Sequence, residues 1–118
     1  MIRNFVFAGA LVLLAACDAG CDNDLLQSEV SPARTRKATK YYRDCGPTTQ
    51  DTSQVTILRR WTPLTGPGNV FASDAQLEDI VVSWESETRL RISYPANAHV
   101  GRRATLVDGV TITYRPRE

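Results

Sequence analysis

The chain has 118 residues, with 14 basic and 13 acidic side chains and a formal net charge of +1. This length suits one compact domain with a modest core rather than two domains. The near-balanced charge excludes the strongly basic composition that is typical of nucleic-acid-binding proteins, so we expect no nucleic-acid partner. Three cysteines are present, an odd number that needs an explanation if the chain is exported.

The N-terminal residues have the three parts of a secretory signal peptide in their usual order. Arg3 supplies a positive charge, residues 5–16 form an apolar run, and the small residues Ala15 and Ala16 end it. A helix that spans a bilayer needs about 20 apolar residues, whereas Asp18 follows this run almost at once. The pattern therefore predicts a cleaved signal peptide at residues 1–16, with an uncleaved apolar anchor as the alternative.

The junction after this run has the sequence Leu-Ala-Ala-Cys at residues 14–17, which resembles the lipobox of bacterial lipoproteins. The resemblance implies cleavage before Cys17, acylation of the Cys17 sulfur and an anchor in the lipid bilayer on the extracytoplasmic side. Asp18 resembles a signal that retains lipoproteins at the inner membrane, which favours the periplasmic face of that membrane over the outer membrane. The alternative is an ordinary signal peptide in which a cysteine happens to follow alanine.

Removal of residues 1–16 changes both the charge and the cysteine count. Arg3 is the one basic residue in this segment, so 13 basic and 13 acidic side chains remain, with no formal net charge. If Cys17 carries lipid, Cys21 and Cys45 remain as a pair in a compartment where disulfides persist. We expect a disulfide between them. The alternative is that Cys21 lies in a flexible segment and Cys45 is a buried thiol.

Hydropathy divides the exported part of the chain in two. Residues 17–36 are polar, and we expect them to form the lipidated N-terminus and a flexible tether. Residues 37–118 contain short runs of β-branched and aromatic residues, separated by Gly, Pro, Asn and Asp. This second part is expected to be mainly β, a single small antiparallel domain of about six strands.

The clearest alternation lies at residues 90–94, where Leu, Ile and Tyr alternate with Arg and Ser. Residues 80–84 have the same period of two, which places one side of each segment towards a core and the other towards water. The stretch between them, residues 85–88, is short and polar. These features predict an antiparallel hairpin.

A second hairpin is predicted at Asp108-Gly109, a pair that tolerates the positive φ angles of a type I′ turn. Its strands would be residues 106–107 and 110–114, with Val, Ile and Tyr on the buried side. The other expected elements are strands at residues 39–43, 54–61 and 70–72, a turn at 44–53, a loop at 63–68 and a helical turn at 73–79 with Ser73 or Asp74 as its cap.

Several short motifs occur between residues 31 and 114: a Ser-Pro start, an Asp-Cys-Gly-x-Thr-Thr turn at 44–49 and a Gln-Val-x-Ile-Leu strand at 54–58. In these motifs the chain resembles a family of small uncharacterised bacterial lipoproteins, a domain of unknown function. It departs from the family at residues 31–34, which read Ser-Pro-Ala-Arg instead of Ser-Pro-Asp-Gly, and at Pro47, where alanine is usual. The resemblance implies a periplasmic or surface β domain and implies no activity.

The turn with Asp44, Thr48 and Thr49 is the candidate for ligand binding, because it concentrates a carboxylate and two hydroxyls beside Cys45. Such groups also build tight turns by hydrogen bonding to their own backbone, which is the structural alternative. A thiol enzyme would need a base near Cys45, and the only histidine, His99, is distant in the sequence. We therefore expect no catalytic residue, no metal site and no cofactor.

Two further groups of residues have a structural and a functional interpretation. Trp61 and Trp84 are expected to be core or half-buried residues, with carbohydrate stacking as the alternative. A cluster of five cations lies within ten residues and is expected to form a solvated strand face and arm, with contact to anionic lipid headgroups as the alternative. These cations are Arg34, Arg36, Lys37, Lys40 and Arg43.

Together these features predict a membrane-anchored envelope lipoprotein with a non-enzymatic structural or interaction role and an envelope protein as its partner. One alternative is a small-ligand or cell-wall binding module that uses the turn at residues 44–49. The other alternative is a thiol enzyme. The sequence indicates no oligomeric state.

Overall fold

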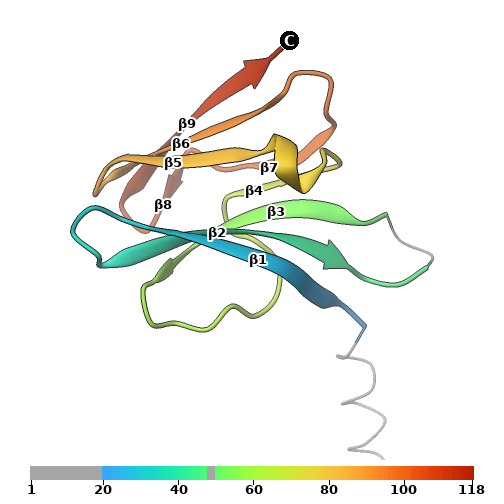
Figure 1. Cartoon of the computed structure of the whole chain (residues 1–118), viewed down its shortest axis with the longest axis horizontal. Coiled ribbons are helices and arrows are strands. Elements are labelled where there is room, and N and C mark those ends of the chain that lie inside the picture. Colours follow the sequence, from blue (N-terminus) through green and yellow to red (C-terminus); the bar gives the residue numbers. More distant parts are fainter. Residues whose placement is uncertain (1–19, 48–49) are drawn as a thin grey trace, which may run out of the picture.

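The chain folds into two β-sheets stacked face to face (Figure 1). The computed structural model describes residues 20–47 and 50–118, and within these ranges it has nine strands and one short 3₁₀ helix. The predicted fold class, a mainly β domain, is confirmed, with more strands than expected. The elements are β1 (Asp22–Val30), β2 (Arg36–Asp44), β3 (Thr52–Arg59), β4 (Phe71–Ser73), η1 (Leu77–Asp79), β5 (Val81–Ser86), β6 (Arg89–Pro95), β7 (Val100–Arg103), β8 (Leu106–Val107) and β9 (Val110–Arg117).

The first sheet, sheet A, has the strand order β1-β2-β3-β4-β7, and the second, sheet B, has the order β5-β6-β9-β8. All neighbouring strands pair antiparallel, as expected, except β6 and β9, which run parallel. The exception follows from the connection between them. The chain leaves sheet B after β6, forms β7 at the edge of sheet A, and then returns to sheet B.

The core lies between the two sheets. Val55 and Phe71 from sheet A belong to one buried cluster with Leu90 and Ile92 from sheet B, and none of these four side chains is exposed. Tyr94 adds its ring, whose centroid lies 5.1 Å from that of Phe71. The alternation predicted for residues 90–94 is confirmed, because its apolar members face this core.

Both predicted hairpins are present. β5 and β6 pair antiparallel around residues 87–88. β8 and β9 pair around Asp108 and Gly109, whose φ angles of 49° and 79° are the two positive values that a type I′ turn requires.

The helical turn expected at residues 73–79 is the short 3₁₀ helix η1, and its predicted cap is wrong. The N-cap position is Gln76, which makes no side-chain capping hydrogen bond. Ser73 belongs to β4, and Asp74 accepts a hydrogen bond from the backbone N–H of His99 at 2.8 Å. These two side chains therefore stabilise the chain before the helix rather than the helix itself.

The largest difference from expectation is at the N-terminal side. Residues 22–30 were expected within the tether at 17–36, but they form β1 and pair with β2 along the edge of sheet A. Most β1 side chains are exposed, so this edge strand has no apolar alternation that would predict it. A register shift beside Leu25, which has a φ angle of 57°, marks a β-bulge. The folded domain therefore begins before residue 37.

Residues 60–70 connect β3 to β4 by crossing the outer face of sheet A, on the side away from sheet B (Figure 1). The predicted loop at residues 63–68 is the central part of this segment. Backbone hydrogen bonds fix both of its ends: Arg60 N–H donates to Thr35 O at 3.1 Å, and Val70 N–H donates to Val55 O at 3.1 Å. The segment therefore forms a cover over one face of the sheet.

Candidate functional site

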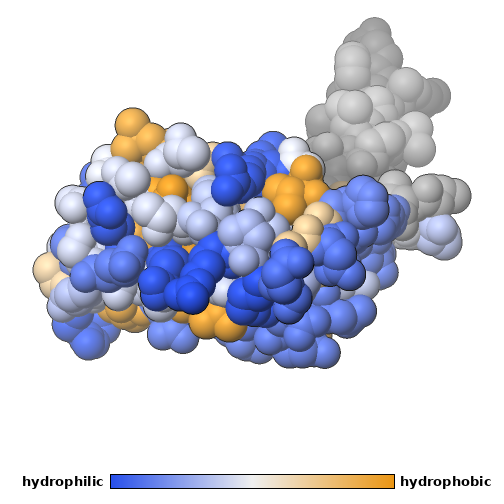
Figure 2. Space-filling view, turned by 90° about the horizontal axis from the view of Figure 1, so that it is seen from above, coloured by the Kyte–Doolittle hydropathy of each residue, from blue (hydrophilic) through white to orange (hydrophobic). Residues whose placement is uncertain are grey.

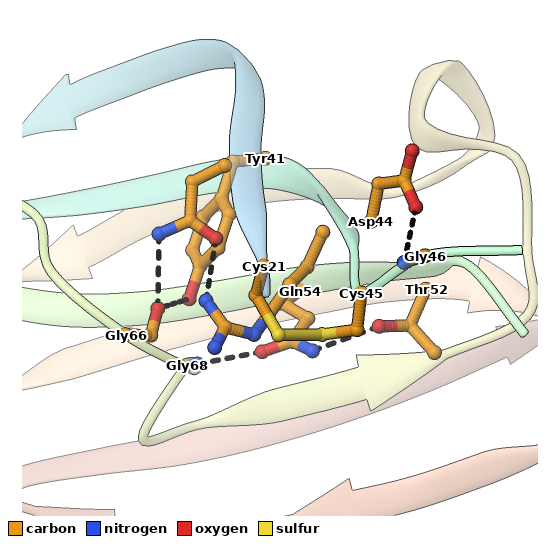
Figure 3. The surroundings of a disulfide bond; sticks show 11 residues. Cys21, Tyr41, Asp44, Cys45, Gly46, Thr52, Gln54, Gly66 and Gly68 are labelled. Carbon is orange, nitrogen blue, oxygen red and sulfur yellow. Dashed lines mark hydrogen bonds between the residues drawn. A yellow bond between two sulfur atoms is a disulfide. The ribbon is translucent and has the colours of Figure 1, made fainter. Parts of the chain in front are cut away.

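A disulfide joins Cys21 and Cys45 at one end of the β1–β2 hairpin (Figure 3). The hairpin register pairs Asp22 with Asp44, so the cysteines occupy the next opposite positions, with their Cα atoms 3.9 Å apart. The predicted disulfide is confirmed. Only three residues separate Cys21 from Cys17, which lies outside the described residues together with the predicted signal peptide.

The turn after Cys45 contains the predicted ligand-binding candidates. Asp44 Oδ1 accepts a hydrogen bond from Gly46 N–H at 2.9 Å, and Gly46 has a φ angle of 107° that suits a residue without a Cβ. In the described part of the turn, Asp44 thus has the structural role. Thr48 and Thr49 lie outside the described residues, so ligand binding by this turn stays a prediction.

Polar side chains fill the space between sheet A and residues 60–70, close to the disulfide (Figure 3). Tyr41 O–H donates to Gly66 O at 3.1 Å, and Gly68 N–H donates to Gln54 Oε1 at 2.6 Å. Burial raises the pKa of the Tyr41 phenol to about 12, so the phenol is a neutral donor at neutral pH. In the part of the chain that the structure describes, every buried polar side-chain atom has a hydrogen-bond partner. The chain itself therefore occupies this face.

The Asn69 side chain holds residues 60–70 against β3, because its amide makes the hydrogen bonds that the backbone of a neighbouring strand would make. Its Oδ1 accepts a hydrogen bond from Ile57 N–H at 2.8 Å, and its Nδ2 donates to Ile57 O at 3.0 Å. The Thr56 hydroxyl adds a hydrogen bond to Asn69 Oδ1 at 3.0 Å. These bonds continue the ladder of β3 beyond the point where β4 stops pairing.

The opposite end of the β1–β2 hairpin is held to sheet B by Glu87, in the β5–β6 turn. The Glu87 carboxylate accepts hydrogen bonds from the Ser31 hydroxyl at 2.7 Å, from Ala33 N–H at 2.6 Å and from the Thr35 hydroxyl. The hydrogen bonds from Thr35 and Ser31 are the main causes that lower the pKa of Glu87. Glu87 therefore connects a turn of sheet A to a turn of sheet B.

Trp61 lies at this same end and is 82% exposed, so its predicted core or half-buried position is wrong. The chain leaves the sheet after β3, and the Arg60 guanidinium lies over the indole, 4.5 Å from the ring centroid. Trp84 is half-buried, as predicted, and its indole N–H donates to the backbone oxygen of Glu29 at 2.8 Å. The exposed tryptophan is thus a surface feature.

The five clustered cations do not form one solvated face. Lys40 points between the sheets, where its Nζ donates to Leu77 O at 3.2 Å and to Ile80 O at 2.7 Å. Arg43 donates to Asn23 Oδ1 at 2.8 Å. The prediction of a shared solvated face is therefore wrong for these two residues, because each has backbone or amide acceptors within the fold.

The thiol-enzyme alternative needs a free thiol at Cys45 and a base beside it. Cys45 is bonded to Cys21 and carries no free thiol in this form. His99 is exposed, and its Nδ1 lies 3.3 Å from Asp74 Oδ2. Within residues 20–47 and 50–118, no group of three His, Cys, Asp or Glu side chains could hold a metal ion.

The outer face of sheet B has a feature that the sequence did not predict. This face is turned towards the viewer in Figure 2 and is mainly hydrophilic, with strongly hydrophilic patches across it. A hollow of about 260 Å³ lies there, lined by Val81, Ser83, Arg91, Ser93, Arg115 and Arg117. The arginines come from β6 and β9, which are not consecutive in the chain, so no local pattern predicts that they meet.

No protein-family model, curated protein or solved structure matches this chain. Among the described residues, no helix is both long and apolar enough to cross a bilayer.

Proposed function

We propose that this chain is a lipid-anchored domain of the bacterial cell envelope with a non-enzymatic interaction role. The observation that carries the proposal is the position of the disulfide. Cys17, the residue in the lipobox-like segment, precedes Cys21 by four positions, and Cys21 is bonded to Cys45 at the end of a sheet. An extended chain spans at most 3.6 Å per residue, so an acylated Cys17 would lie within about 14 Å of the folded domain.

A connection this short would orient the domain on the membrane. β1 runs for nine residues from the disulfide to Val30, a length of about 30 Å at the usual rise of a strand. The disulfide end would then face the bilayer, and the end with Glu87 and Trp61 would face the aqueous compartment. We call the end with Glu87 and Trp61 the far end, because it would lie farthest from the bilayer. Under this proposal Arg34 and Arg36 also lie at the far end, so they would not reach the lipid headgroups.

The far end has the features of an interaction surface. Arg36 Nε lies 3.2 Å from Asp108 Oδ2, which brings the β8–β9 turn and the 67% exposed Leu106 to the end that carries Trp61. Tryptophan and arginine are enriched among the residues that dominate binding energy in protein interfaces. Trp61, with Arg60 stacked on it, is therefore the residue that we expect to make the main contact with an envelope protein partner.

The lipid anchor at Cys17 is tested by growing cells with labelled palmitate and comparing wild type with Cys17→Ala. We expect label on the wild-type chain only, and we expect the variant to leave the membrane fraction. Separation of inner and outer membranes on a density gradient then tests the inner-membrane position that Asp18 favours. Equal label on both chains would contradict lipidation at Cys17.

The interaction role is tested with a photoreactive amino acid at position 61 or 106, in cells that express the full chain. Position 26 is the matched control, because Leu26 is also exposed but lies on β1. We expect adducts of one common mass from positions 61 and 106 and none of that mass from position 26. Absence of an adduct from both far-end positions would contradict the proposal.

A further inference from the structure

The outer face of sheet B brings three arginines together through strand register. On β6 the core side is taken by Leu90 and Ile92, so Arg91 and Ser93 point outward. The parallel pairing of β6 with β9 sets Ser93 opposite Arg115, and Pro95 opposite Arg117. The single parallel pair of sheet B therefore assembles the cluster.

β5 completes the hollow on the other side of β6. Ser83 lies opposite Arg91 and Val81 lies opposite Ser93 in the antiparallel register. The hollow thus has three guanidinium groups, two hydroxyls and one apolar side chain along its lining. Its lining includes no carboxylate, although the chain as a whole has almost as many acidic as basic residues.

The hydrogen bonds in the hollow leave donors available. Arg117 is held in place, because it donates to Ser93 Oγ at 2.6 Å and to Asp79 O at 2.6 Å. Ser93 accepts this bond, so its own hydroxyl hydrogen remains available to an acceptor. Outside the backbone ladder of the sheet, the side chains of Arg91 and Arg115 form no hydrogen bond or ion pair with any residue that the structure describes.

Acidic residues of the described chain form no ion pair with the arginines of the hollow. Glu85 follows Ser83 on the outward side of β5, and it accepts a long hydrogen bond of 3.4 Å from the Thr113 hydroxyl. Neither of the two ion pairs in the described residues involves Arg91 or Arg115. The register places Arg91 opposite Ser83 and Thr113, and Arg115 opposite Ser93, so no acidic side chain faces these two charges across the strands.

We propose that this hollow binds a phosphate group through the guanidinium groups of Arg91, Arg115 and Arg117. A guanidinium presents its N–H donors in a planar fork that matches phosphate oxygens, and charge-assisted bonds of this type are strong. A phosphate has three terminal oxygens, one for each arginine, whereas a carboxylate has two. The hollow is smaller than the usual 300–1,000 Å³ of sites for whole drug-sized ligands, which suits one charged group of a larger molecule.

Isothermal titration of the full chain in detergent with inorganic phosphate tests the site directly. We expect saturable binding that weakens about tenfold in Arg91→Gln and in Arg115→Gln, the size of one lost charge-assisted hydrogen bond. Arg89→Gln is the matched control, because Arg89 lies on the same strand but does not line the hollow. Equal weakening in all three variants, or no saturable binding, would overturn the proposal.

The phosphate can belong to a soluble ester or to a lipid headgroup. Two further binding experiments use the full chain with Cys17→Ser, so that acylation at residue 17 does not itself cause membrane binding. Binding of glycerol phosphate, without binding to vesicles that contain phosphatidic acid, supports a soluble ester. Sedimentation with the vesicles that is lost in Arg115→Gln supports the headgroup. Binding to neither probe overturns the site, and it leaves the proposed anchor and interaction role unaffected.

Discussion

The outer faces of the two sheets differ in what happens to their polar side chains. On sheet A, Tyr41 and Gln54 are buried beneath residues 60–70 and hydrogen bond to its backbone. On sheet B, no segment of the described chain crosses the outer face in the same way (Figure 1), and the side chains of Arg91 and Arg115 keep their donors available. The polar character of a strand residue therefore does not indicate whether it meets water. The path of a distant segment of chain decides this.

On the covered outer face of sheet A, substitution of Gly68 should cause the largest loss of stability. A Cβ added there would lie 2.5 Å from Val55 O, a backbone atom that cannot move without distorting β3. Gly68→Ala should lower the free energy of unfolding by about 3 kcal/mol, the upper part of the range for overpacking. Chemical denaturation measures the change. In the control Gly101→Ala, the added Cβ is 4.0 Å from its nearest neighbour, and we expect almost no loss. Similar losses in both variants would show that residues 60–70 do not pack as described.

Asn69 should have the next largest effect, because its amide replaces strand backbone. Asn69→Ala leaves the N–H and C=O of buried Ile57 without these partners, at a loss of about 2 kcal/mol in unfolding free energy. Asn97→Ala, in an exposed turn, is the control for general effects of removing an amide. An Asn69→Ala protein as stable as wild type in thermal unfolding would contradict the strand-like role of the amide.

Removal of a single hydroxyl from the covered face should have a smaller effect. Tyr41→Phe loses the bond to Gly66 O, but Asn23 Nδ2 still donates to that oxygen at 3.1 Å. We expect a loss of about 1 kcal/mol. Denaturant titration checks this, and a loss above that of Asn69→Ala would reverse the order of contributions that we assign to the cover.

Glu87 joins the two sheets, and its contribution should depend on pH. Its pKa is lowered from the ordinary value of 4.5 by hydrogen bonds that only the folded chain provides. The stabilisation is therefore fully present above pH 4.5 and is lost as pH falls through the lowered pKa. Glu87→Gln should show a small loss of Tm at pH 7 that disappears in acid. A difference between the two proteins that grows in acid would contradict this assignment.

The open face should be the least sensitive in stability. Arg115→Gln removes an exposed charge without a partner in the described chain, so the free energy of unfolding should change by less than about 0.5 kcal/mol. The same variant should lose phosphate affinity, which separates a binding role from a folding role. A loss of stability as large as that of Tyr41→Phe would show that Arg115 supports the fold instead.

Local features of the sequence predicted part of this molecule well. The period of two at residues 90–94 and the pair Asp108-Gly109 act through neighbouring residues, so the strand and the turn follow directly from chain geometry. The Cys21–Cys45 disulfide was predicted from the count of cysteines. The structure confirms all three.

Other parts depend on where residues far apart in the chain meet. β1 and β7 are edge strands whose side chains are largely exposed, so neither has an apolar period. Trp61 is a large aromatic residue of the kind found in cores, but it follows the end of β3 and remains 82% exposed. In each case the sequence lacks a local signal because burial is set by the partner strand or segment.

The sequence by itself determined the mainly β class, two hairpins and one cysteine pair, because period, turn geometry and redox pairing are local or countable properties. It also predicts export and lipidation at Cys17, which the lipid-labelling experiment tests. Only the tertiary structure decided that residues 60–70 close one face and that β6 and β9 bring Arg91 and Arg115 together on the other. The physical reason is that both outcomes depend on contacts between residues that are not neighbours in the sequence, so no local pattern predicts them.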